Sequence, residues 1–283
     1  MTHRIPLGAV AFLCLGVAPT AAAAQDAAGQ PPPKVLQIFI ESVKPGKSAA
    51  HEKIEVGWPA AFSKAKWPTN YIGMTSMSGQ QDAWFVAGYP SWAALETDNE
   101  NVGKNKILSR ELERLGALDG ELLTGTRGIY AVYHPEMSYR PDIDVGRMRY
   151  VAFTTMSLKP GYDSAFADTR KLVLDAHVKA NLDEHYAVYE VATGLPGPTY
   201  LIVFPMRSLQ EVDAFAENHD GKTYRDALGE TGRQRLRQFA REGMVSSETR
   251  LFAFSPKMSY PAEAWVASDP EFWRPKVATA SKP

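Results

Sequence analysis

Cysteine is almost absent from this sequence. The chain has 283 residues and one cysteine, Cys14, which lies in an apolar run near the N-terminus. If that run is removed as a signal, the rest of the chain has no disulfide, no thiolate metal site and no cysteine nucleophile. An exported protein of this kind depends on its hydrophobic core, and about 250 residues suffice for one large domain or two ordinary ones.

The sequence also lacks a surplus of charge of either sign. Lys and Arg number 31 against 32 Asp and Glu, which gives no indication of a nucleic-acid partner or an anionic membrane surface. Beyond the N-terminal run, no apolar stretch is long enough for a membrane span. There is no Gly-x-Ser-x-Gly elbow, P-loop, G-x-G-x-x-G or zinc-protease motif, so hydrolase, kinase and nicotinamide dehydrogenase functions have no support.

The first residues have the three parts of a secretory signal. His3 and Arg4 supply positive charge, residues 7–17 are apolar, and residues 21–24 are four alanines that suit a signal peptidase. We therefore predict cleavage after Ala24 and a periplasmic or secreted protein. The alternative is a retained membrane anchor.

Three short motifs recur in the same order in the two halves of the chain. They are Lys-Pro-Gly at 44–46 and 159–161, Glu-Asn at 100–101 and 217–218, and Met-Ser-Tyr at 137–139 and 258–260. The offset grows slowly from 115 to 117 and then 121 residues, as small insertions require. This ordered recurrence predicts a tandem duplication of one structural unit.

Each half has the pattern of a βαββαβ unit. In the first half we predict strands at 35–43, 71–77, 83–89 and 126–133, a helix at about 47–66, and a helical region that Ser91 caps and Gly103 interrupts. In the second half we predict strands at 149–158, 186–191, 200–204 and 248–254, and helices at 162–180, after a Ser208 cap, and at 223–241. These assignments rest on apolar periodicity and on Pro and Gly breaks.

The pattern divides the chain into six segments. They are a signal peptide (1–24), a flexible N-terminal linker (25–34), a first α+β repeat (35–139), a linker (140–147), a second α+β repeat (148–261) and a C-terminal tail (262–283).

The first predicted strand is apolar on both of its faces. Leu36, Ile38 and Ile40 lie on one face, and Val35 and Phe39 on the other. A sheet with one face in water alternates apolar and polar residues instead. We therefore predict an α+β fold in which the antiparallel sheets of two ferredoxin-like repeats pack face to face as an eight-stranded barrel, with the helices outside.

The Lys-Pro-Gly turn after the first strand and the tandem layout resemble the dimeric α/β barrel superfamily. That group includes antibiotic-biosynthesis-monooxygenase-like and NIPSNAP-like proteins, and this chain resembles a fused pseudo-dimer of such units over residues 35–260. The resemblance implies the barrel fold, and it transfers no catalytic residue.

His51 is the first candidate for chemistry. It shares a helical stripe with Ile54 and Trp58, and the second half has Phe166 at the 115-residue offset. A histidine where the other half has an ordinary core residue is a candidate base or ligand in a pocket between helix and sheet. The alternative is a histidine at the edge of the stripe with its polar tip in water.

Glu41 is the second candidate. It shares a strand face with Gln37. A carboxylate on an apolar sheet face has a raised pKa or a cationic partner if it is buried, and Arg127 and Arg250 on the closing strands are candidate partners. The alternative is a structural ion pair or a frayed strand edge.

Aromatic residues concentrate in the first half and line either an apolar ligand pocket or the core. They are Trp58, Trp67, Tyr71, Trp84, Tyr89 and Trp92. Our predicted ligand-binding residues are Gln37, Trp58, Tyr71, Trp84 and Arg127. The group His177, Asp183, Glu184 and His185 lacks the spacing of a metal motif, so we interpret it as a solvated loop and predict no metal site.

These observations favour an exported protein that binds a hydrophobic or aromatic small molecule between helices and sheet. The first alternative, which the barrel resemblance implies, is a cofactor-independent monooxygenase-like or isomerase-like enzyme with His51 or Glu41 as proton acceptor. The second alternative is haem binding through one histidine; no other cofactor is expected. The chain is predicted to act as a monomeric pseudo-dimer or a homodimer. The sequence leaves the ligand and the presence of catalysis open.

Overall fold

The computed structural model describes residues 29–274, apart from the side chains of residues 219 and 220. The signal peptide predicted at 1–24 lies outside the described residues. Within 29–274, no helix is both long and apolar enough to cross a membrane.

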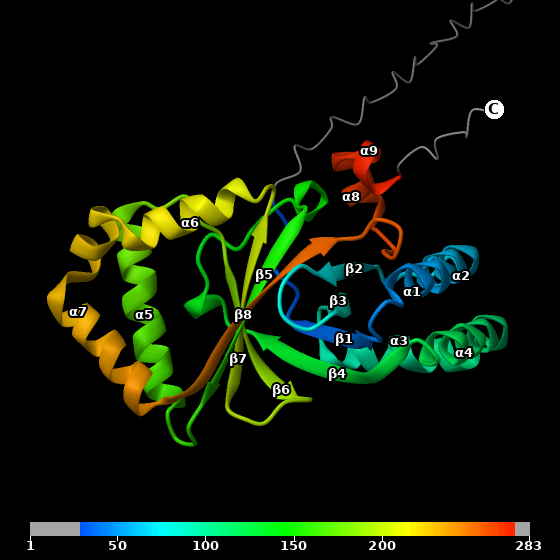
Figure 1. Ribbon diagram of the computed structural model, residues 1–283, viewed down its shortest axis with the longest axis horizontal. Coiled ribbons are helices and arrows are strands. Elements are labelled where there is room, and N and C mark those ends of the chain that lie inside the picture. Colours follow the sequence, from blue (N-terminus) through cyan, green and yellow to red (C-terminus); the bar gives the residue numbers. More distant parts are fainter. Residues whose placement is uncertain (1–28, 275–283) are drawn as a thin grey trace, which may run out of the picture.

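Eight antiparallel strands form a closed barrel in the order β1-β3-β2-β8-β5-β7-β6-β4 (Figure 1). The strands are β1 (Val35–Val43), β2 (Tyr71–Ser76), β3 (Asp82–Tyr89), β4 (Leu123–Tyr133), β5 (Tyr150–Leu158), β6 (Ala187–Thr193), β7 (Thr199–Met206) and β8 (Met244–Phe254). The protein therefore has an α+β fold built on an eight-stranded barrel.

The strand pairings of the first half recur in the second. Strand β1 pairs with β3 and β4, and β2 pairs with β3, just as β5 pairs with β7 and β8, and β6 pairs with β7. The pairs β2–β8 and β4–β6 join the two groups of four strands. The two groups of four strands are thus hydrogen-bonded into one closed barrel, and this barrel has no open edge for a further chain to pair with.

Successive residues of β1 point alternately into the barrel and outward toward the helices. Leu36, Ile38 and Ile40 are buried inside, where they join residues of both halves in one core. Trp84 packs there against Phe252, with ring centroids 4.5 Å apart. The prediction that the inner strand faces cover one another is therefore confirmed, and each such buried side chain contributes about 1.5–3 kcal/mol of stability.

The helices lie outside the barrel, with α1 to α4 on one side and α5 to α7 on the other (Figure 1). They are α1 (Ser48–Glu55), α2 (Gly57–Ala65), α3 (Trp92–Lys104), α4 (Lys106–Gly120), α5 (Asp163–Ala180), α6 (Gln210–Asp220) and α7 (Lys222–Glu242).

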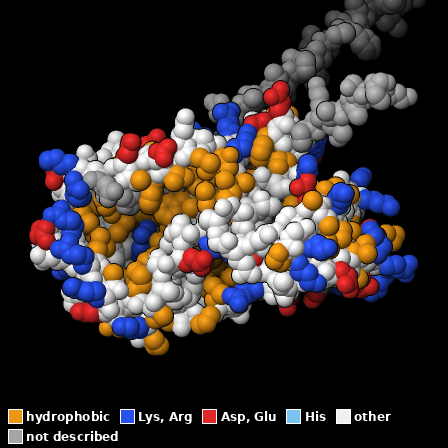
Figure 2. Space-filling model, viewed as in Figure 1, with side chains coloured by type: hydrophobic (Ala, Val, Ile, Leu, Met, Phe, Trp, Pro, Cys, Tyr) orange, Lys and Arg blue, Asp and Glu red, His pale blue; other side chains and the backbone are white. Residues whose placement is uncertain are grey.

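In Figure 2, hydrophobic side chains gather near α6 and β5, and Leu209, Val212 and Phe215 of this region are exposed.

Three helix boundaries differ from the prediction. The helix predicted at 47–66 is divided at Val56, because Pro59 has no N–H to continue the hydrogen bonds of α1. The break predicted at Gly103 falls at Asn105, whose side chain accepts a hydrogen bond from Leu108 N and caps α4. Ser91 caps α3 as predicted, whereas α6 follows Leu209 and has no side-chain cap.

The segment predicted as a C-terminal tail is structured up to Arg274. It contains α8 (Glu263–Ser268) and α9 (Pro270–Trp273), and α8 packs against a short 3-10 helix at Val145–Arg147. Trp273 is buried and donates a hydrogen bond from its indole N–H to Gly146 O. Its aromatic side chain gives this short region a core contact that a polar tail would lack.

The two Met-Ser-Tyr segments connect the halves reciprocally. The segment that follows β4 pairs with the second half through Tyr139 and Tyr186, and the one that follows β8 pairs with the first half through Tyr71 and Tyr260. In each segment the serine Oγ accepts a hydrogen bond from a backbone N–H of the other half, that of Val188 for Ser138 and that of Gly73 for Ser259.

Candidate functional site

A group of ionisable side chains lies between the outer face of β1 and the helices α1 and α4. Glu41 comes from β1, His51 and Glu55 from α1, and Asp119 from the last turn of α4, and none is more than 4% exposed. The spacing of four residues places His51 and Glu55 on the same helix face. We call these four residues the polar cluster.

The polar cluster is compact. His51 Nε2 lies 2.8 Å from Glu41 Oε2 and 3.4 Å from Asp119 Oδ1. One ligand atom from each of the four side chains lies within 4.8 Å of the others. Within the described residues, Glu55 Oε1 and Asp119 Oδ1 are buried and accept no hydrogen bond.

The cationic partners predicted for Glu41 do not reach it. Arg127 is exposed, and it pairs in register with Ile40, which places it on the other face of the sheet. Arg250 is paired with Asp82 at 2.6 Å. In the part of the chain described, His51 is thus the basic side chain paired with Glu41 and with Asp119.

Burial and mutual repulsion raise the pKa of these carboxyl groups. Burial, together with the charges of Glu41 and Asp119, raises the pKa of Glu55 to about 9, with the neighbouring Trp58 side chain acting in the opposite direction. Burial also raises the pKa of Asp119 to about 7, where Glu41 adds to the rise and His51 opposes it. The site therefore holds protons near neutral pH unless another cation replaces them.

Two predicted ligand-binding aromatics border the polar cluster. Burial and the charges of Glu55 and Glu41 raise the pKa of Tyr71 well above its usual value, and its hydroxyl has no hydrogen-bond partner among the described residues. The Trp58 side chain lies next to Glu55 and opposes the rise in the pKa of its carboxyl group. Sequence reasoning thus selected four residues that meet at one place: Glu41, His51, Trp58 and Tyr71.

The other predicted residues lie elsewhere. Gln37 shares the Glu41 face, but it is hydrogen-bonded to Tyr130 and Tyr89. Trp84 is in the barrel core. Sequence reasoning missed Glu55 and Asp119, although their spacing carried a signal: each follows an inward-facing residue, His51 or Leu115, by one helical turn.

The second half has no such cluster at the corresponding positions. At the 115-residue offset, Met156, Phe166 and Arg170 stand in place of Glu41, His51 and Glu55. Phe166 is fully buried and packs on Tyr200, with centroids 4.2 Å apart. An apolar side chain therefore fills the position that His51 occupies in the first half.

His177 and Glu184 are buried, contrary to the predicted solvated loop. His177 Nε2 lies 3.0 Å from Glu184 Oε2, and Nδ1 lies 2.7 Å from Val173 O. The rings of Tyr139, Tyr186 and Tyr224 surround the imidazole. The packing of α5 against α7 encloses a region whose local sequence is polar.

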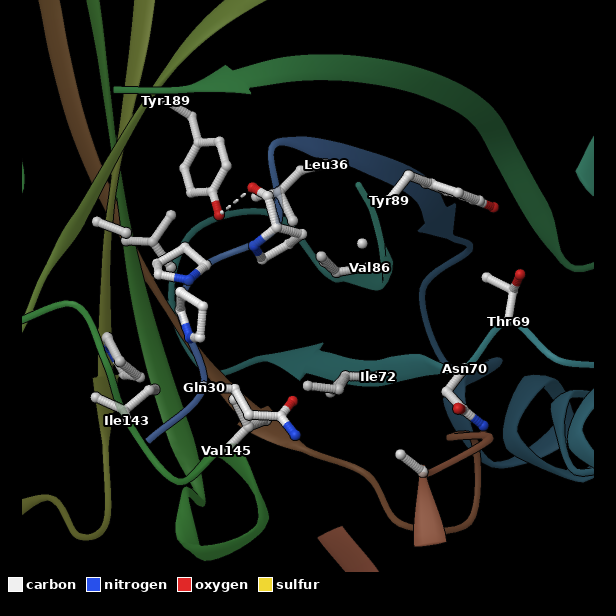
Figure 3. A pocket seen from close by; sticks show the side chains of 18 of the residues that line it. Gln30, Leu36, Thr69, Asn70, Ile72, Val86, Tyr89, Ile143, Val145 and Tyr189 are labelled. Atoms are coloured by element: carbon white, nitrogen blue, oxygen red, sulfur yellow. Dashed lines mark hydrogen bonds between the residues drawn. The ribbon is translucent and has the colours of Figure 1, made fainter. Parts of the chain in front are cut away.

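A separate apolar cavity of about 850 Å³ lies at one end of the barrel (Figure 3). Its inner wall combines side chains of the first half, Leu36, Ile72, Met74 and Val86, with side chains of the second half, Val151, Phe153 and Val203. The polar cluster does not contribute to this wall.

The rim of the cavity comes from several connecting segments. Figure 3 shows Ile143 and Val145 with Gln30 on one side and Thr69 and Asn70 on another. Residues 31–33, three prolines, cross the cavity wall, and the hydroxyl of Tyr189 donates a hydrogen bond of 3.2 Å to Pro33 O. The cavity is thus mostly apolar with a few polar groups at its edge.

Solved structures with a similar fold include two candidate monooxygenases and an anthrone oxidase-like protein. A candidate monooxygenase from Fusobacterium nucleatum aligns with a TM-score of 0.53 at 11% identity, over 79% of this chain and 93% of that one. A candidate monooxygenase from Lactobacillus acidophilus gives 0.50 at 8%, over 78% and 93%. An anthrone oxidase-like protein gives 0.50 at 14%, over 78% and 91%.

These likenesses establish the fold and no more, because every identity is low. With the closed barrel, they confirm the fold expected from the sequence, an α+β fold built on an eight-stranded antiparallel barrel. No protein-family model and no curated protein sequence matches the chain.

Proposed function

We propose that this protein binds one small hydrophobic or aromatic molecule in the cavity at the end of the barrel. The observation that carries the proposal is a largely apolar space of about 850 Å³ with walls from both halves of the chain. Small-molecule sites are typically apolar clefts of about 300–1,000 Å³ with a few polar groups that orient the ligand. Thr69, Asn70 and Gln30 supply such groups at the rim.

This location differs from the one predicted from the sequence. The space expected between helices and sheet is filled by the polar cluster in the first half, and by Phe166 and its aromatic neighbours in the second. The ligand is instead expected to lie between the two halves. A mixed lining of this kind suits a molecule with an apolar body and one hydrogen-bonding end.

Catalysis by His51 or Glu41 is the second candidate, and their contact at 2.8 Å is the observation that favours it. An imidazole held by a carboxylate can accept a proton from a substrate. However, a substrate would need a route to a histidine that is 2% exposed. Oxygen uptake with quinol-like or enediol substrates, lost in His51→Ala, supports this function over simple binding.

Haem binding is a further alternative, and the lining of the cavity limits which histidine could hold the haem. Among the described residues, His185 is the imidazole that lines the cavity, and its Nδ1 lies 2.7 Å from Arg140 O. A haem there would use His185 Nε2 as its ligand. A Soret band on addition of haem, lost in His185→Ala, would select this alternative.

Two further expectations from the sequence stay proposals. The first is export, for which residues 1–24 have the form of a signal. The second is origin by tandem duplication, which the repeated motifs and the repeated strand pairings support.

The binding proposal can be tested with cavity-filling variants. The mature chain is screened against fatty acids, quinones and polycyclic aromatic acids by thermal melting and by quenching of tryptophan fluorescence, since Trp265 lines the cavity. A ligand at 100 times its Kd stabilises the fold by about 2.7 kcal/mol. Val86→Phe and Val203→Phe fill the cavity from opposite halves, and we expect each to weaken binding by about tenfold or more, about 1.4 kcal/mol.

Val178→Phe is the matched control, because the same change falls on an exposed position of α5. It should leave affinity unchanged. If no compound of the panel binds, or if both cavity variants bind as tightly as the wild type, the proposal fails.

A further inference from the structure

We propose that the polar cluster Glu41, His51, Glu55 and Asp119 binds one divalent transition-metal cation. The inference does not depend on the proposed ligand cavity, because none of the four residues lines that cavity. It rests on the ligand set, on the unpartnered oxygens and on the contrast with the second half.

The ligand set suits a divalent ion. Three carboxylates and one imidazole, contributed by β1, α1 and α4, place one atom each within 4.8 Å of one another. Donors bonded to one ion at 2.0–2.2 Å lie at most about 4.4 Å apart, so small side-chain movements would bring all four atoms onto one central ion. Imidazole and carboxylate together suit Zn²⁺, Mn²⁺ or Fe²⁺, whereas Ca²⁺ and Mg²⁺ bind oxygen donors and water.

Two buried oxygens without a hydrogen bond favour a bound cation independently of the acidic composition, and Asp119 Oδ1 has only His51 Nε2 nearby, at 3.4 Å. Glu55 and Asp119 are 2% and 1% exposed, yet Oε1 of the former and Oδ1 of the latter accept no hydrogen bond in the described chain. A buried unsatisfied acceptor costs about 1–3 kcal/mol, and more when it is charged. A cation in the centre would satisfy both oxygens at once.

The charge balance leads to the same conclusion. Among the described residues, His51 is the basic side chain of this cluster, and its Nε2 is paired with Glu41 and with Asp119. If the three carboxyl groups are ionised, the single imidazole of His51 cannot neutralise them, whereas a divalent ion beside it would offset most of their charge. Buried charges in proteins are paired or coordinate metals.

The second half shows that the fold does not need this cluster. Phe166 occupies the position of His51 there and Met156 that of Glu41, and both belong to an apolar core. The same strand and helix therefore pack with apolar side chains at two of the three positions, and with the buried Arg170 at the position of Glu55. Retaining four ionisable groups in the first half costs stability, which a bound ion would offset.

The test measures metal binding by the full mature chain. After treatment with a chelator, the protein is titrated with Zn²⁺ and with Mn²⁺ by calorimetry, and with Co²⁺ by its visible absorption. We expect one ion per chain and a rise in the melting temperature on loading. Purification without a chelator, followed by elemental analysis, should recover about one transition metal per chain.

Ligand variants locate the ion. Glu55→Gln and Asp119→Asn preserve size, and His51→Phe restores the side chain found in the second half. Each should weaken binding by more than the roughly 10- to 100-fold that loss of an outer-shell partner costs. Glu113→Gln is the control, because Glu113 is an exposed residue of α4, and it should bind like the wild type. Circular dichroism shows whether each variant is folded.

The proposal is overturned if the folded wild-type chain binds none of the three ions. It is also overturned if Glu55→Gln and Asp119→Asn are folded and bind as tightly as the wild type. The outcome is distinct from the ligand proposal, since Val86→Phe should abolish neither metal binding nor the absorption of bound Co²⁺.

Discussion

At the scale of single residues, the polar cluster is the feature with the clearest physical consequences. The sequence identified Glu41 and His51 because each replaces an apolar residue of the other half. Glu55 and Asp119 were missed because their helix stripes contain many charged residues, and a stripe does not reveal which charge turns inward. Only packing decides that Asp119 is 1% exposed while Glu113, on the same helix, is exposed.

The polar cluster makes the metal-free protein sensitive to alkali. The folded pKa of Glu55, about 9, lies above its value of 4.5 in the unfolded chain, and that of Asp119, about 7, lies above 3.8. Between these limits the folded state binds more protons than the unfolded state. The free energy of unfolding therefore falls as pH rises from about 4.5 toward 9. We expect a decrease of a few kcal/mol.

Urea unfolding in the presence of a chelator measures this dependence. Glu55→Gln mimics the protonated acid, so its stability should fall less steeply with pH, whereas Glu113→Gln should follow the wild type. Equal slopes in Glu55→Gln and the wild type would show that Glu55 is not the group responsible. Saturating Zn²⁺ should flatten the wild-type curve.

At the scale of elements, the sequence predicted which segments form strands and helices better than it predicted where they end. Short apolar segments bounded by Pro and Gly breaks located all eight strands. Helix ends depended on single residues such as Pro59 and Asn105, and the neighbouring Gly103 carried the stronger sequence signal for a break. The burial of α9 was missed because a helix of four residues is too short to show apolar periodicity.

The two Met-Ser-Tyr segments are the element-scale feature with a direct test. Ser138→Ala leaves the buried N–H of Val188 without its acceptor, and Ser259→Ala does the same to Gly73. Each change should lower the free energy of unfolding by about 1–3 kcal/mol. Ser63→Ala, at an exposed position of α2, should change it by less than about 0.5 kcal/mol.

Chemical denaturation of the three variants, compared with the wild type, provides the values. If Ser138→Ala and Ser259→Ala unfold like Ser63→Ala, the Met-Ser-Tyr segments do not hold the halves together. If only one of the two variants has a lower free energy of unfolding than the wild type, only that Met-Ser-Tyr segment holds the halves together.

At the scale of the whole molecule, the sequence predicted a closed barrel because its first strand is apolar on both faces. The same reasoning failed to locate the cavity. Leu36, Val86 and Val203 have the pattern of ordinary core residues, and periodicity shows which way a side chain points without showing whether the space it meets is filled. That space depends on the volumes of side chains from both halves together, which no local pattern records.

The central claim is that a ligand binds between the halves of the chain, inside the end of the barrel. The most direct measurement is a crystal structure of the mature protein with the tightest compound from the binding screen. Electron density for the compound in contact with Val86 of one half and Val203 of the other is the predicted result. Density between the helices and the outer sheet face, with an empty barrel, would contradict the account.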